Sequence, residues 1–169
     1  STGNAASGST LQLAVRYNDG FIAFINGVEV ARRSMGLNGM FAYRDQASFL
    51  THTSTSLETI DLGVASSLLQ SGDNILAIQV HNRSSTDGTL LMDADLKLAS
   101  GTTIVNGEGS WQYFAGLAEP SGGLVDYQQV LNGVQDAPDV EWATLAFNDS
   151  TWISGVGPVG YETANPPHY

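Results

Sequence analysis

The 169-residue sequence predicts an all-β fold, an antiparallel β-sandwich of the jelly-roll kind with little helix. Several short segments alternate apolar and polar side chains with a period of two residues, which is the pattern of a strand with one buried face. Turn-forming residues separate these segments at short intervals, and no stretch keeps the 3.6-residue period of a helix.

The first predicted elements are a strand and a hairpin. Residues 11–17 alternate strictly, and the turn sequence Asn-Asp-Gly follows at 18–20. Asn-Gly at 26–27 joins the apolar run 21–25 to residues 28–31. Because both turn residues tolerate the positive φ that a two-residue hairpin loop requires, this segment predicts two paired strands.

Three further strands are expected before residue 100. They cover residues 57–62, 75–81 and 90–98, and the last shows the cleanest alternation, with its acidic residues and Lys97 opposite an apolar face. Residues 34–56 predict a long loop, because they are rich in Gly, Ser, Thr and Asn. One helical turn is expected at 64–69.

The C-terminal part shows fewer clear strand patterns than the first 100 residues. Strands are expected near 111–114 and 142–147, whereas 155–161 is too glycine-rich to predict regular structure. Between them, residues 116–139 fit a helix or a strand equally well. The sequence thus divides into a linker at 1–10 and a single domain at 11–169.

Charge and composition limit the classes of molecule that the protein could bind. The chain has 17 acidic and 6 basic residues and a net charge of −11, and no Lys or Arg occurs in residues 101–169. Phosphate-binding surfaces depend on Lys and Arg, so nucleic acid is excluded as a partner. No segment approaches the 18 apolar residues that membrane insertion requires, while divalent cations and neutral polymers remain possible partners.

Cysteine is absent, which excludes disulfides, a thiolate zinc site and a cysteine nucleophile. The histidines at 52, 81 and 168 have no metal-ligand spacing. Two carboxylates within reach of each other are expected by chance among 17 acids, so they do not indicate a glycosidase. The sequence therefore predicts a protein that is not an enzyme.

Three segments carry a family resemblance. They read Y-N-D-G-F-I-A-F-I-N-G-V-E-V-A-R at 17–32, L-Q-S-G-D-N-I-L-A-I-Q-V-H-N at 69–82, and F-N-D-S-T-W followed by G-V-G-P-V-G-Y at 147–161. They resemble motifs of galactose-binding-like jelly-roll modules, which are carbohydrate-binding-module-like domains of large secreted bacterial proteins. The resemblance implies a jelly roll and an extracellular location.

The order of the motifs is permuted relative to that family. Residues 11–99 resemble the closing half of the module, and residues 101–169 resemble its opening half. Either one repeat ends and the next begins within the chain, or a single module is circularly permuted. The family's strand after the G-Y motif is not evident after Tyr161, so neighbouring copies of the module are possible partners that supply a strand.

The resemblance also implies a structural calcium ion. Its ligands would be Asn148, Asp149 and Thr151 in the loop before Trp152, completed by an acid of the late strand. That acid would be Asp93 or Asp95. In the alternative, Asn148 and Asp149 cap a turn, and the acids of the strand are solvated.

Sugar binding requires exposed aromatic faces and polar side chains beside them. Tyr43 and Tyr127 are the predicted platforms because they lie in irregular segments, whereas the three tryptophans are expected in the core. Arg32 and Arg33 are candidates to hold a uronic acid or a sulfate, or else to pair with neighbouring acids.

Together these observations predict a non-catalytic extracellular module that binds a polysaccharide and thereby attaches a larger secreted protein or enzyme to it. The alternative is a structural module, a repeat or subunit of a surface array or filament that exchanges strands with its neighbours.

Overall fold

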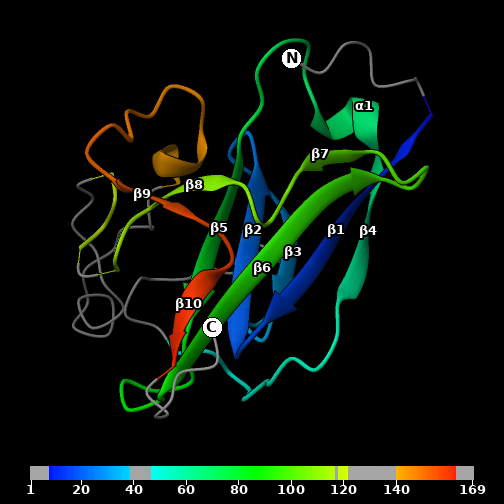
Figure 1. Ribbon diagram of the computed structural model, residues 1–169. Coiled ribbons are helices and arrows are strands. Elements are labelled where there is room, and N and C mark those ends of the chain that lie inside the picture. The colour runs from blue at the N-terminus through cyan, green and yellow to red at the C-terminus, as the bar shows by residue number, and fades with distance from the viewer. Residues whose placement is uncertain (1–7, 39–46, 117, 122–139, 163–169) are drawn as a thin grey trace.

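The fold is known from a computed structural model that describes residues 8–38, 47–116, 118–121 and 140–162. In these ranges ten strands form three antiparallel sheets, and two of the sheets face each other (Figure 1). The predicted all-β sandwich with little helix is therefore confirmed.

The larger sheet has five strands in the order β10-β6-β1-β4, with β7 also paired to β6. One edge of β6 pairs with β1, and the other edge pairs first with β10 and then with β7. The strands are β1 (Thr10–Tyr17), β4 (Glu58–Val64), β6 (Thr89–Leu98), β7 (Thr103–Val105) and β10 (Val159–Glu162).

The facing sheet has three strands in the order β3-β2-β5, and a separate ribbon pairs β8 with β9. Asn26 and Gly27 have φ angles of 52° and 82° in the turn between β2 and β3, so the predicted hairpin is confirmed. These strands are β2 (Gly20–Ile25), β3 (Val28–Arg33), β5 (Leu76–His81), β8 (Ser110–Tyr113) and β9 (Ile153–Val156).

The three-stranded sheet is buried on both faces at β2. On one face, Phe21, Ala23 and Ile25 contact the large core that fills the space between the two sheets. On the other face, Ile22 and Phe24 contact a second apolar cluster, which Trp142 and Ala143 complete. This double burial explains why residues 21–25 are a continuous apolar run and not an alternating one.

The expected helical turn is present as α1 (Ala65–Leu68), and the strands expected at 11–17, 57–62, 75–81 and 90–98 are present within one or two residues. On β6, Met92, Ala94 and Leu96 are buried, as the alternation predicts. The ambiguous stretch 116–139 lies largely outside the described residues.

Two expectations for the C-terminal part are wrong. Residues 142–147 are not a strand, because Trp142 and Ala143 belong to the 3-10 helix η1 (Glu141–Ala143), whose apolar side covers β2. Residues 155–161 are mostly in strands despite their glycines: 155–156 end β9, and 159–161 belong to β10. Gly160 suits β10 because a Cβ at that position would collide with the Leu90 carbonyl oxygen of β6.

Candidate functional site

The candidate site is a cleft of about 690 Å³ that runs along β5. We call it the β5 cleft. Its floor includes the inner face of β6, and its walls include β8, β10 and the segment around Trp142 and Trp152. In Figure 1, β8, β9 and β10 all lie on the β5 side of the sandwich.

The cleft exists because β5 is the edge strand of the three-stranded sheet. Every residue of β5 from Leu76 to His81 lines the cleft. Leu76, Ile78 and Val80 point toward the core between the sheets, whereas Ala77 lies in the second cluster with Trp142. The cleft therefore follows the edge of β5 and reaches both faces of the strand.

Aromatic side chains dominate the walls. Tyr113, Phe114 and Tyr161 line the cleft and remain 37%, 39% and 44% exposed. Phe114 is in turn next to the two tryptophans: the Phe114 and Trp152 ring centroids are 5.5 Å apart, and those of Trp152 and Trp142 are 6.4 Å apart. A ligand in the cleft would thus meet exposed rings that are supported by a partly buried aromatic cluster.

Polar groups lie among these rings. Gln79, His81, Gln112 and Asp149 line the cleft, and the side-chain amide oxygen of Gln112 accepts a hydrogen bond of 2.9 Å from the Ser154 hydroxyl. The Tyr161 hydroxyl accepts a hydrogen bond from the Asn82 side-chain amide, which holds the Tyr161 ring at the mouth of the cleft. The lining can therefore offer both apolar faces and hydrogen-bonding groups to one ligand.

Of the sequence-predicted ligand residues, the two that the structure describes, Arg32 and Arg33, do not line this cleft. Tyr43 and Tyr127 lie outside the described residues. Arg32 is buried, and its guanidinium donates to Glu29 (2.9 Å to each carboxylate oxygen) and to the Met35 carbonyl oxygen (2.6 Å). Arg33 donates to Glu58 at 2.8 Å and 2.5 Å. Both arginines thus adopt the ion-pair alternative, on the strand farthest from β5 in its sheet.

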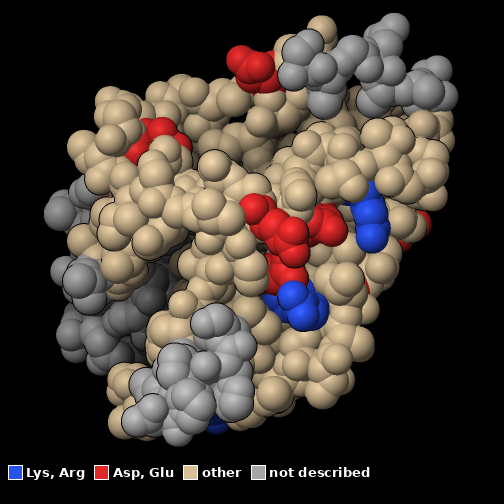
Figure 2. Space-filling model, in the orientation of Figure 1, with Lys and Arg blue, Asp and Glu red and all other residues tan. Residues whose placement is uncertain are grey.

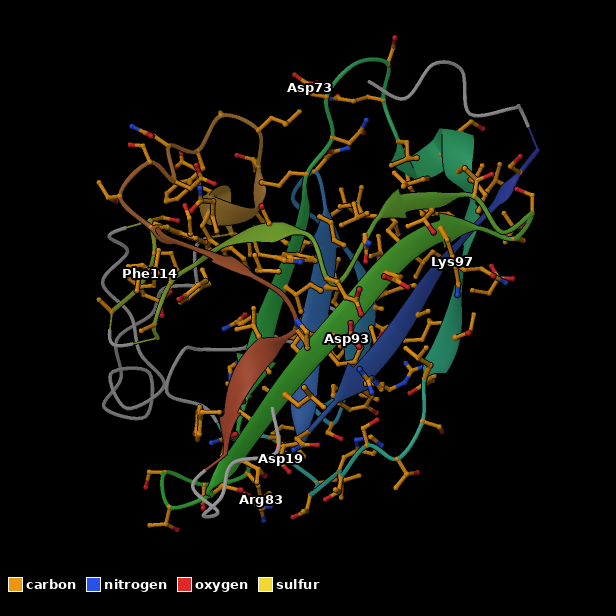
Figure 3. All side chains as sticks on the ribbon, in the orientation of Figure 1. Asp19, Asp73, Arg83, Asp93, Lys97 and Phe114 are labelled. Carbon is orange, nitrogen blue, oxygen red and sulfur yellow. The ribbon has the colours of Figure 1, made fainter. Side chains whose placement is uncertain are left out.

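The acids proposed as calcium ligands on β6 are occupied by other contacts. Asp93 accepts hydrogen bonds of 2.9 Å and 2.6 Å from Arg16, and Asp95 accepts the Gly107 backbone N–H at 2.7 Å. Figure 2 shows acidic side chains gathered over β6 with basic side chains beside them, and Figure 3 marks Asp93 on that strand. Each of these contacts falls on one oxygen of its carboxylate, Oδ2 of Asp93 and Oδ1 of Asp95.

The loop residues proposed as calcium ligands do not lie beside these acids. The Asn148 side chain accepts the Ser150 backbone N–H at 3.1 Å and so caps a turn, and Thr151 is exposed. Asp149 lines the β5 cleft together with Met92 and Ala94, whereas Asp93 and Asp95 alternate with those residues and therefore point to the opposite face of β6. Within the described part of the chain, no three His, Cys, Asp or Glu side chains group closely enough to hold a metal ion.

The described histidines have structural contacts. The His52 ring stacks on Tyr17 at 4.1 Å between centroids, and its Nδ1 lies 2.9 Å from the Tyr17 carbonyl oxygen. His81 is buried at the end of β5. Burial raises the pKa of Tyr17, and the negative charge of Glu58 raises this pKa further. Tyr17, His52 and Glu58 lie outside the cleft lining and serve the fold, whereas His81 also lines the cleft.

Sequence reasoning missed the cleft and its exposed aromatic residues. Trp111 and Tyr113 did indicate a strand at 111–114, and β8 confirms it. The exposure of Tyr113 and Phe114 follows from the pairing of β8 with β9, 40 residues farther along the chain, which periodicity cannot reveal.

No helix among the described residues has the length and apolar character needed to cross a membrane. Comparison of the chain with protein-family models, with curated proteins and with solved structures gave no match.

Proposed function

We propose that this protein is a non-catalytic carbohydrate-binding module that takes its glycan in the β5 cleft. The observation that supports this function is the set of three exposed aromatic side chains on one cleft, Tyr113, Phe114 and Tyr161, with polar side chains between them. Together with the motif resemblance, it favours an extracellular module that attaches a larger secreted protein to a polysaccharide.

The chemistry of a sugar matches this lining. A pyranose ring has apolar C–H faces that stack on aromatic rings, and hydroxyl groups that exchange hydrogen bonds with amides and carboxylates. Gln79, Gln112 and Asp149 supply such groups within the same cleft. The opening of the cleft along β5 suits a chain of sugar units better than a small enclosed ligand.

The test is a glycan array followed by titration calorimetry with the best ligand. We expect Phe114→Ala and Tyr161→Ala to weaken binding about tenfold each, the value of one aromatic contact. Phe49→Ala is the matched control, because Phe49 is 47% exposed and does not line the cleft. Equal affinity for the wild type and both cleft variants would rule out this site, and melting curves would show that each variant is folded.

A second function is favoured by one observation. β5 lies at the edge of its sheet, and that edge faces the apolar β5 cleft, so an extended segment of a neighbouring copy could pair with β5. We propose strand exchange between copies as the alternative, with the protein acting as a subunit of an array. Sedimentation over a wide concentration range tests it, and a monomer at every concentration would contradict it.

A further inference from the structure

We infer that the β5 cleft accepts glycans without acid groups and rejects uronates and sulfated glycans, and that Asp149 is the residue that imposes this selection. The inference rests on the proposed carbohydrate function. It concerns the class of glycan, which neither the motif resemblance nor the aromatic lining specifies.

The first observation is the position of the cations. Residues 101–169 contain no Lys or Arg, and they supply β8, β10 and the Trp142–Trp152 segment of the cleft wall. This wall therefore offers no basic side chain to a carboxylate or a sulfate.

The remaining described cations are elsewhere. Arg16 pairs with Asp93 on the outer face of the five-stranded sheet, and Lys97 alternates with the buried Leu96 and so points to that same face (Figure 3). Arg32 and Arg33 are paired with acids on β3 and β4. Arg83 is exposed in the turn after β5 and does not line the cleft. Among the described residues, no Lys or Arg lines the cleft.

The second observation is the state of Asp149. It is half-buried and lines the cleft beside Trp152, whose backbone N–H donates to the Asp149 carbonyl oxygen at 2.8 Å. Within the described ranges, its carboxylate has no hydrogen-bond or ion-pair partner, whereas Glu119, the other acid that lines the cleft, is engaged in an interaction. An ionised carboxylate only accepts hydrogen bonds, so it can receive two sugar hydroxyls but repels an acid group of a ligand.

The overall charge of the molecule also disfavours acidic glycans. The net charge of −11 gives a negative field around the cleft, and this field disfavours the approach of polyanions. A glycan with neutral or amine-bearing rings meets no such penalty. Selection against acid groups is therefore expected both from the acids that line the cleft, of which Asp149 has the carboxylate without a partner, and from the long-range field.

The experiment compares neutral, amine-bearing, uronate and sulfated glycans on one array at about 0.01 M and about 1 M salt, because the screening length falls from about 30 Å to about 3 Å over that range. At low salt we expect wild-type protein to bind the neutral or amine-bearing members at least about tenfold more tightly than acidic ones. High salt should reduce that difference.

Two variants identify the residue. Asp149→Asn preserves shape and should improve binding of uronates about threefold to tenfold, the effect of removing one nearby unit charge at a wet surface. Asp73→Asn makes the same change in net charge, but on an exposed turn outside the cleft lining. It should change the affinity for uronates by less than about twofold.

The outcomes separate the two proposals. A preference for uronates or sulfated glycans would overturn the selection and leave the carbohydrate function standing. Equal effects of Asp149→Asn and Asp73→Asn would overturn the role of Asp149. If no glycan of any charge binds, both the carbohydrate function and the selection fail.

Discussion

Asp19 illustrates how a single side chain holds distant segments together. It is only 2% exposed, and its φ of 64° lies in the left-handed region that Asn and Asp tolerate better than most residues. One carboxylate oxygen accepts the His52 backbone N–H (3.1 Å) and the other accepts the Arg83 backbone N–H (2.8 Å). The turn between β1 and β2 is thereby tied to a loop and to the segment after β5.

We expect Asp19→Ala to lower the free energy of unfolding by about 1 to 3 kcal/mol, because it leaves two partly buried backbone donors without their acceptor. Asp73→Ala is the control, since Asp73 is exposed in a turn, and should change this energy by less than about 0.5 kcal/mol. Figure 3 shows the two residues at opposite ends of the molecule. Urea denaturation measures the free energy of unfolding of both variants, and equal effects of the two substitutions would contradict the role assigned to Asp19.

Tyr17 makes stability depend on alkaline pH. Its pKa in the folded protein is raised, first by burial and then by Glu58, above the ordinary value of about 10. Above about pH 10 the unfolded chain therefore releases this proton more readily than the folded protein. The stabilisation is complete below that pH and is lost as the pH rises through the folded value.

The measurement is urea denaturation from about pH 8 to pH 11 for the wild type and Tyr17→Phe. Phe cannot ionise, so the free energy of unfolding of the variant should fall less steeply above about pH 10. Parallel curves would show that Tyr17 does not contribute to the alkaline loss.

At the scale of elements, the pairing of β10 with β6 forms one wall of the β5 cleft. Val159 lies opposite Met92 and Tyr161 lies opposite Leu90, so this pairing places the Tyr161 ring at the cleft. Gly160 allows the close approach of the two backbones because it has no Cβ. Only four residues of β10 pair with β6, so the pairing of the two strands depends strongly on the close backbone approach at Gly160.

We expect Gly160→Ala to detach β10 from β6, because the added Cβ would collide with the Leu90 carbonyl oxygen. Hydrogen exchange should show lost amide protection in β10, with the pairing of β1 and β6 retained. Gly116→Ala is the control, since no atom lies within 4 Å of a Cβ there. Unchanged protection of Gly160→Ala would contradict this account of the strand.

At the scale of the whole molecule, the excess of acids is the dominant feature. A net charge of −11 destabilises the compact state by self-repulsion, and dissolved salt screens this repulsion. Any cation therefore raises stability to some degree. A calcium test must separate this general effect from binding at one site.

Calcium binding by the loop at 148–151, which the motif resemblance implies, predicts a higher melting midpoint in CaCl2 than in NaCl of equal ionic strength. At 100 times its dissociation constant a bound ion adds about 2.7 kcal/mol, and a chelator should remove this gain. Asp149→Asn should abolish the difference between the two salts. Identical midpoints in CaCl2 and NaCl would contradict the calcium prediction.

The sequence by itself determined the strands that have one buried face. β6 and the hairpin of β2 and β3 could be predicted because alternation and Asn-Gly act over a few residues. It also determined the acidic, cation-free C-terminal part, since charge is a property of composition.

Only the tertiary structure decided the cleft and the contacts of its candidate residues. The pairings of β10 with β6 and of β8 with β9 join residues 40 to 73 positions apart, and they decide which aromatic side chains reach the cleft. The same long-range packing placed Trp142 in a 3-10 helix against Phe24, gave Arg33 the partner Glu58, and set Asp149 and Asp93 on opposite faces of a sheet. Local patterns cannot determine these contacts, because their free energy comes from segments that meet only when the chain has folded.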